Sequence, residues 1–109
     1  MISWQDFEKI ELRAGTIIRA EKFDNARKPA YKLWVDLGET GIKCSSAQIT
    51  IHYKAEDLIG KQVLCVTNFP PKQIANFISE VLVTGFADSD NHVILCSVDK
   101  PVPNGARLF

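Results

Sequence analysis

The chain of 109 residues has few cysteines and no long apolar run, and its first residues lead us to expect no secretory signal. Its three cysteines, Cys44, Cys65 and Cys96, are widely spaced and form no CxxC pair or Cys/His cluster. We therefore expect no zinc site, and we expect buried free thiols in a reducing compartment. No apolar run exceeds five residues, whereas a membrane-spanning helix needs about 20, so membrane insertion is not expected. Because the first residues lack a basic stretch followed by an apolar core, the cytoplasm is the expected location.

The sequence also lacks the motifs of common enzyme classes. It contains no GxSxG, GxxxxGK[ST], GxGxxG or HExxH motif. Its two histidines, His52 and His92, are 40 positions apart and are expected as ordinary surface residues. Ser45 and Ser46 have no base or orienting acid close to them in the sequence. We therefore expect a non-enzymatic protein that holds neither a cofactor nor a metal ion.

The chain carries no excess of positive or negative charge, because its 13 Lys and Arg residues balance 13 Asp and Glu residues. The overall charge therefore does not indicate a nucleic-acid partner. Residues 19–32 nevertheless contain five bases, which indicates either a local basic patch or an ordinary solvated loop. These bases are Arg19, Lys22, Arg27, Lys28 and Lys32.

Short strands separated by turns are the main pattern of the chain, which we expect to form one domain over residues 1–109. Ser3 and Asp6 resemble a capping box, and Trp4, Phe7 and Ile10 follow at helical spacing. They predict a short helix whose aromatic side packs inward. Strands are expected at residues 12–23, 31–37, 42–46, 62–67, 80–86 and 92–97, with a helical turn at 55–60.

The order of these elements favours an all-β fold with short helices, a five-stranded Greek-key barrel of the OB type. Three strands come first, then a short helical segment, then two or more strands. Gly15, in the middle of the first strand, indicates a bulge or tight bend of the kind that a barrel corner needs. Pro70 and Pro71 remove two backbone donors, which excludes residues 68–72 from a central strand. A six-stranded sandwich is the structural alternative.

Alternation is clearest at residues 31–37, where one face is apolar and the other polar. The polar face carries Lys32, Trp34 and Asp36, and we expect Lys43 and Ser45 at outward positions of the next strand. A base beside an aromatic ring suits phosphate contact combined with stacking on nucleic-acid bases. Packing of Trp34 under a neighbouring element fits the same pattern equally well.

Several segments resemble the small tRNA-binding domains that occur alone or appended to methionyl- and phenylalanyl-tRNA synthetases. The segments are ELRAGTI at residues 11–17, KLWVDLG at 32–38, YKAEDLIGK at 53–61 and SEVLV at 79–83. Within that family, the chain is similar to the CsaA group of export-related chaperones. That similarity rests on residues 26–34, 41–43, 45–50, 68–71, 79–82 and 101–105, with Phe77.

The resemblance implies a homodimer built by the terminal segments, and a surface that binds tRNA in many relatives or polypeptides in the CsaA group. We accordingly expect a chaperone-like homodimer that binds unfolded or pre-secretory polypeptides. Structure-specific tRNA binding in trans with synthetases is the alternative, and a purely structural assembly factor is a third. The expected peptide-binding residues are Ser45, Ser46, Gln48, Phe69, Pro70, Pro71 and Phe77. The expected RNA-binding residues are Arg27, Lys28, Lys32, Trp34, Lys43, Lys72, Asn76 and Ser79.

Three positions depart from the pattern of the CsaA group. Gln73 and Asn76 stand where a second base and a glycine are usual, and Cys44 stands where glutamine is usual. Gln73 lowers the positive charge of its loop and Asn76 adds none, so these departures weaken the expectation of tRNA binding more than that of the fold.

Overall fold

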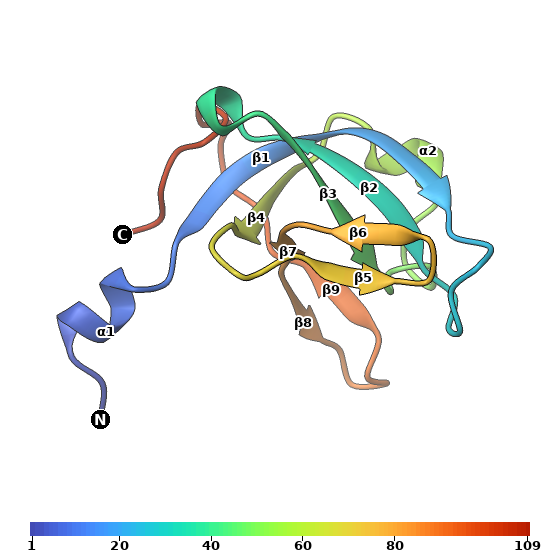
Figure 1. Ribbon diagram of the computed structural model, residues 1–109, viewed down its shortest axis with the longest axis horizontal. Coiled ribbons are helices and arrows are strands. Elements are labelled where there is room, and N and C mark those ends of the chain that lie inside the picture. Colours follow the sequence, from blue (N-terminus) through green and yellow to red (C-terminus); the bar gives the residue numbers. More distant parts are fainter.

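The computed structural model describes residues 1–109 as a mostly-strand fold with two short helices (Figure 1). The helices are α1 (Trp4–Glu8) and α2 (Ala55–Leu58). The long strands are β1 (Leu12–Lys22), β2 (Tyr31–Asp36), β3 (Ile42–Ala47) and β4 (Gln62–Val66). The short strands are β5 (Lys72–Ile74), β6 (Phe77–Ser79), β7 (Leu82–Val83), β8 (Gly85–Ala87) and β9 (Val93–Leu95). No helix has the length and apolar character to cross a membrane.

Five strands form one antiparallel sheet that curls into a nearly closed barrel. The strand order is β3-β2-β1-β4-β7, while β5–β6 and β8–β9 form separate two-stranded ribbons. The sheet closes where the Cys44 carbonyl of β3 accepts hydrogen bonds from the N–H groups of Glu80 (2.8 Å) and Val81 (3.2 Å). These two residues lead directly into β7, so the two ends of the sheet meet. The expected five-stranded OB-type barrel is confirmed, and the sandwich is excluded.

The predicted strand at residues 80–86 is wrong as a continuous element, because the chain changes partner at Thr84. The Thr84 N–H donates to the carbonyl of Leu64 in β4 (3.0 Å), and the Thr84 carbonyl accepts from the N–H of Cys96 (3.1 Å). The residues before Thr84 therefore pair with β4, while those after it pair with β9. A change of partner within one apolar run leaves no mark in the sequence pattern.

The barrel interior is filled by aliphatic side chains from β1, β2, β4 and the segments around α2. Leu33, Val35 and Leu37 are buried as their alternation predicted. The rest of the fully buried core includes Ile17, Leu58, Val63 and Cys65. Burial raises the pKa of the Cys65 thiol to about 12. Cys44 and Cys96 are only partly buried, so the expectation of three buried thiols holds for Cys65 alone.

Ser45 was expected to face outward, and this prediction is wrong. The register of the β2–β3 hairpin pairs Leu33 with Ser45 and Trp34 with Cys44. Because directly opposed residues share a face of the sheet, Ser45 lies on the core side with Leu33 and is 1% exposed. The five-residue connection between Asp36 and Ile42 sets this register. A shift of the pairing by one residue would move every side chain of β3 to the opposite face of the sheet.

Gly15 marks a close approach of two strands. A Cβ atom at Gly15 would lie 2.5 Å from Cγ1 of Val35 and 2.7 Å from Cδ2 of Leu37. The bulge that was expected here lies a little further along, between Ile17 and Arg19, where the pairing of β1 with β2 shifts. Glycine at position 15 therefore lets β1 press against β2 just before the strand bends.

The C-terminal segment runs back along β1. The N–H of Gly105 donates to the Ala14 carbonyl (2.7 Å), and the N–H of Ala14 donates to the Ala106 carbonyl (2.9 Å). Gly105 has φ +90°, and a Cβ atom there would meet the Leu37 carbonyl oxygen at 2.6 Å. The hydroxyl of Thr16 also donates to Oδ1 of Asn104 (2.6 Å). Residues 104–108 thus extend the sheet contacts beyond the five barrel strands.

Helix α1 projects away from the barrel (Figure 1). Its capping box is present, since Ser3 Oγ accepts from the Asp6 N–H and Asp6 accepts from the Ser3 N–H. The inward packing predicted for its apolar side is wrong, because Trp4 is 78% exposed and Ile10 is 46% exposed. The helix buries no residue. Its apolar side chains therefore form an exposed face that this chain itself does not cover.

Phe77 holds the β5–β6 hairpin on the outside of the barrel. Its ring packs edge-on against Phe23 (centroids 5.5 Å apart) and Trp34 (5.8 Å). Lys32 Nζ lies over Phe23 and Phe77 at 4.9 and 5.4 Å, and the Arg19 guanidinium lies 4.3 Å from the Trp34 ring. We call these five residues the aromatic cluster. It explains the polar alternation of β2, because Lys32 and Trp34 pack under the hairpin.

Replacing Phe77 with alanine should loosen the β5–β6 hairpin while the barrel stays folded. Each aromatic pair contributes about 0.5–1.5 kcal/mol beyond its buried area, and 1.4 kcal/mol is about tenfold in an equilibrium. Amide hydrogen exchange in residues 72–79 should therefore accelerate roughly tenfold or more, while that of β1 and β4 changes little. Ile78→Ala is the matched control, because Ile78 lies in the same strand and is 54% exposed. Equal exchange in both variants would contradict the role given to Phe77.

Candidate binding grooves

The β5–β6 hairpin is joined to β3 by a short series of polar contacts. The Ser46 N–H donates to Ser79 Oγ (3.2 Å), and the Ser79 hydroxyl donates to the Val81 carbonyl (3.3 Å). The Cys44 N–H donates to Glu80 Oε1 (3.1 Å), and Lys43 Nζ lies 3.9 Å from Glu80 Oε2. Burial and the neighbouring Glu80 carboxylate raise the pKa of the Cys44 thiol, so Cys44 is a poor nucleophile at neutral pH.

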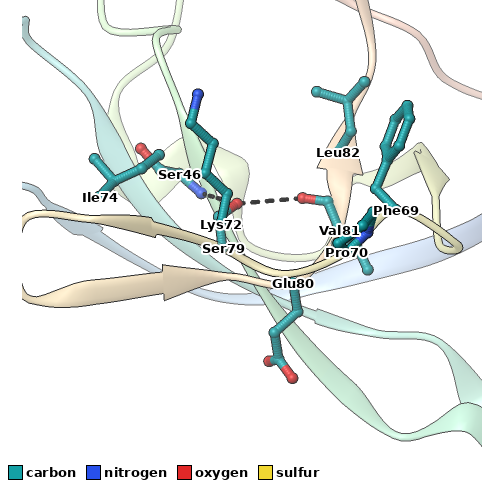
Figure 2. A pocket seen from close by; sticks show the side chains of 9 residues that line it. All are labelled: Ser46, Phe69, Pro70, Lys72, Ile74, Ser79, Glu80, Val81 and Leu82. Carbon is teal, nitrogen blue, oxygen red and sulfur yellow. Dashed lines mark hydrogen bonds between the residues drawn. The ribbon is translucent and has the colours of Figure 1, made fainter.

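A groove of about 450 Å³ opens between this junction and the loop that follows β4 (Figure 2). We call it the Phe69 groove. Figure 2 shows Phe69 and Leu82 side by side on one flank, Ile74 and Ser46 on the other, and Glu80 pointing away. Phe69 is 55% exposed and Leu82 is 48% exposed, so two neighbouring apolar side chains of the groove face solvent. The full lining is Ser46, Phe69, Pro70, Lys72, Ile74, Ser79, Glu80, Val81 and Leu82.

A second and a third groove continue from the first along the surface. The second, which we call the Arg27 groove, has a volume of about 510 Å³ and shares Ser46 and Ile74 with the Phe69 groove. The third, which we call the His92 groove, has a volume of about 320 Å³ and shares Lys28 and Gln48 with the second. Together they form a track that begins beside the β5–β6 hairpin, carries Arg27 and Lys28 in its middle and ends at His92. The Arg27 groove is lined by Asn25, Ala26, Arg27, Lys28, Ala30, Ser46, Gln48, Ile74 and Ala75, and the His92 groove by Lys28, Pro29, Gln48, Ile49, Thr50, Ile51, Asn91, His92 and Val93.

Eight of the residues named from the sequence line this track. Four of them were expected to bind peptide and four to bind RNA, and the fold brings both groups to one surface. Of the peptide set these are Ser46, Gln48, Phe69 and Pro70, and of the RNA set Arg27, Lys28, Lys72 and Ser79.

The remaining expected residues have other surroundings. Ser45 is buried in the core, which removes it from any peptide site. Phe77, Lys32 and Trp34 belong to the aromatic cluster, and Lys43 faces Glu80. Pro71 and Asn76 are exposed but line none of the three grooves.

Sequence reasoning missed the β5–β6 hairpin and hence Ile74 as a groove residue, and it did not name Val81 and Leu82, which follow the hairpin. Each strand of the hairpin has three residues, and its turn contains Ala75 at φ 52° instead of the glycine that marks such turns. The Gln73 side-chain amide donates to the Ala75 carbonyl (3.1 Å) and supports the turn. The two prolines before Lys72 were a signal for an edge strand rather than for a loop alone.

Comparison with known proteins places this architecture in a family. Residues 12–107 match the model of a family described as "Putative tRNA binding domain". The CsaA chaperone from Bacillus anthracis is 48% identical, with a TM-score of 0.94 over 100% of this chain and 99% of that one. The CsaA chaperone protein from Picrophilus torridus is 49% identical, with a TM-score of 0.93 and complete coverage of both chains.

A curated relative shows the same domain inside a much larger protein. The methionine–tRNA ligase of Methanocaldococcus jannaschii is 36% identical over 101 residues, which are 93% of this chain but 15% of the ligase. The chain thus spans about one-seventh of that relative's length. Since the family match covers nearly all of the barrel and its C-terminal extension, this protein belongs to the tRNA-binding domain family, and its whole fold is that of the CsaA chaperone structures.

Proposed function

We propose that this protein binds extended segments of unfolded or pre-secretory polypeptides in the cytoplasm, as a chaperone-like binding protein without catalysis. The observation that carries the proposal is the Phe69 groove, an apolar trough bordered by a few polar groups. Phe69 and Leu82 offer contact that does not depend on the sequence of the client, because hydrophobic attraction is not directional. Similarity over the full chain to two CsaA proteins that are named as chaperones supports the same function.

The edge of β5 offers a second, equally general kind of contact. β5 pairs only with β6, so its outer edge carries unpaired N–H and C=O groups. An extended polypeptide can add to such an edge through main-chain hydrogen bonds, while neighbouring pockets accept its side chains. Lys72 and Ile74, both on β5, line the Phe69 groove beside this edge. Main-chain pairing combined with an apolar trough suits clients of many sequences.

Phe69→Ala should weaken binding of a fluorescein-labelled, permanently unfolded polypeptide. The lost apolar contact is worth about 1–2 kcal/mol, which is roughly five- to thirtyfold in Kd. Fluorescence anisotropy measures the change. Ile59→Ala is the matched control, since Ile59 is 50% exposed, close to the 55% of Phe69, but lies outside the three grooves. If both variants bind the polypeptide as the unchanged protein does, the Phe69 groove is not the binding site.

We further propose that the protein is a homodimer that buries its terminal segments. Residues from α1 and from the C-terminal tail line one apolar hollow of about 630 Å³. Trp4 is 78% exposed there and Phe109 is fully exposed. Together these side chains leave a large apolar surface for a chain of this size. Arg107 holds the two segments together, because its Nη2 donates to the Glu8 carbonyl (2.8 Å). A second copy presents the same apolar patch, so a two-fold contact would cover both.

Trp4→Glu should convert the dimer to a monomer at micromolar concentration, because it puts an unpaired charge into each half of the apolar contact. Sedimentation velocity measures the change in mass. Ile59→Glu, on a different exposed surface, should leave the dimer intact. A monomer for the unchanged protein, or a dimer for Trp4→Glu, would contradict this arrangement.

Binding of tRNA is the second candidate function, favoured by the family match and by three cations along the track. Arg27, Lys28 and Lys72 are exposed, line the grooves and form no salt bridge. Lys32 and Lys43, expected from the sequence as phosphate contacts, are engaged by the aromatic cluster and by Glu80. The phosphate contacts are therefore proposed at Arg27, Lys28 and Lys72.

If tRNA binds along the track, Lys28→Ala should lower its affinity and reduce the slope of log K against log salt by about one. Titration of labelled bulk tRNA at about 50 and 200 mM salt measures both quantities. Lys61→Ala, an exposed lysine outside the grooves, is the control and should leave the slope unchanged. Binding with the same slope in both variants would move the RNA site away from this track.

A further inference from the structure

Two histidines and an aspartate that are distant in the sequence meet beside the His92 groove. His52 lies in the loop before α2, whereas Asp88 and His92 flank the turn between β8 and β9. His52 Nε2 is 2.6 Å from Asp88 Oδ2, and the His52 and His92 rings are 6.0 Å apart between centroids. One donor atom from each of the three residues lies within 4.8 Å of the other two.

The β8–β9 turn holds the Asp88 carboxylate in one orientation. Asp88 Oδ1 accepts hydrogen bonds from the N–H groups of Asp90 (2.9 Å) and His92 (2.8 Å). The Asp88 N–H donates to the His92 carbonyl (2.8 Å), and Asn91 at φ 64° completes the tight turn. Oδ2 is thereby directed at His52. The hydrogen bonds from His92 and His52 lower the pKa of Asp88, so the carboxylate is ionised at neutral pH.

The loop that carries His52 is fixed by its neighbour Tyr53. The Tyr31 hydroxyl donates to the Tyr53 carbonyl (2.8 Å), and the Tyr53 hydroxyl accepts from the Leu95 N–H (3.0 Å). These bonds tie the loop to β2 on one side and to β9 on the other. Both segments that supply the three side chains are therefore positioned by contacts that do not involve the imidazole rings, as a preorganised site requires.

We propose that His52, Asp88 and His92 form a surface binding site for a divalent transition-metal ion, with Zn²⁺ as the ion they suit best. Two imidazoles and one carboxylate are a donor set that Zn²⁺ accepts, with water completing the tetrahedron. The ring of His92 forms no hydrogen bond, so its nitrogen lone pair is available to a metal ion. The hydrogen bond between His52 and Asp88 does not explain why the His92 ring lies beside them. The site goes beyond the proposed polypeptide binding and does not depend on it.

Binding requires only small movements of the side chains. Ligand atoms around tetrahedral Zn²⁺ at about 2.1 Å are roughly 3.4 Å from one another. His52 and Asp88 must separate slightly, and the donor atoms of the cluster start within 4.8 Å of one another. His52 carries its ring proton on Nδ1 in the bound form, which leaves the Nε2 lone pair for the ion. Because His92 also lines the His92 groove, the bound ion would fix one wall of that groove to the His52 loop.

The test is a titration of EDTA-treated protein with ZnCl₂, followed by NMR of the imidazole nitrogens. The chain has only two histidines, so each signal is assigned by a single substitution. We expect both imidazoles to shift together and to saturate at one ion per chain. A shift of neither imidazole, or of one alone, would overturn the proposal.

Variants give a second, independent measurement by isothermal titration calorimetry with ZnCl₂. Asp88→Asn and His92→Gln should each raise the Kd at least tenfold, since loss of a direct ligand should cost no less than the roughly 10–100-fold lost with an outer-shell partner. Asp90→Asn is the control, because Asp90 lies in the same turn and contributes only its N–H to the cluster. Amide spectra establish that each variant is folded. Unchanged affinity in Asp88→Asn and His92→Gln would place the ion elsewhere, such as on the cysteines, and would overturn the proposal.

Discussion

The closure of the barrel at Cys44 is the contact on which the candidate surface depends. Strand β3 is the end of the sheet, and its Cys44 carbonyl accepts the N–H groups of Glu80 and Val81. Without this pairing, β3 would present an open edge, and the hairpin before Glu80 would be held only by the aromatic cluster and the bond from Ser46 to Ser79. The same junction aligns Ser46 with Ser79 and forms the floor of the Phe69 groove. One pair of backbone hydrogen bonds therefore both completes the fold and builds the site.

Much of the barrel could be predicted from the sequence because its strands are long and strongly patterned. Leu33, Val35 and Leu37 alternate over a whole strand, so their burial follows from period two alone. The error at Ser45 arose because the turn before β3 decides which of its residues face the core. The alternation of apolar and polar residues does not reveal how that turn aligns β3 with β2. The inward packing of Trp4 failed for another reason. Helical spacing shows that a face is apolar, but not whether the same chain covers it.

The candidate site was less predictable because its residues are chosen by tertiary contacts. Phe69 and Lys28 could be named from the family resemblance, but no local pattern tells that Lys32 lies over two aromatic rings while Lys28 stays exposed. The histidines illustrate the same limit. His52 and His92 are 40 positions apart, and only the pairing of β8 with β9 beside the Tyr53 loop brings them together. Donor spacing in a sequence detects metal sites within one loop, and misses those assembled across the fold.

The return of the C-terminal segment to β1 has a consequence for the order of folding. Gly105 bonds to Ala14 across some 90 positions of chain, so closing this contact costs more loop entropy than any hairpin in the barrel. The barrel strands are joined by much shorter connections and can form first. Arg107 then couples the tail to the α1 region through the Glu8 carbonyl. We therefore expect the two terminal segments, and the apolar surface they carry, to form after the barrel strands.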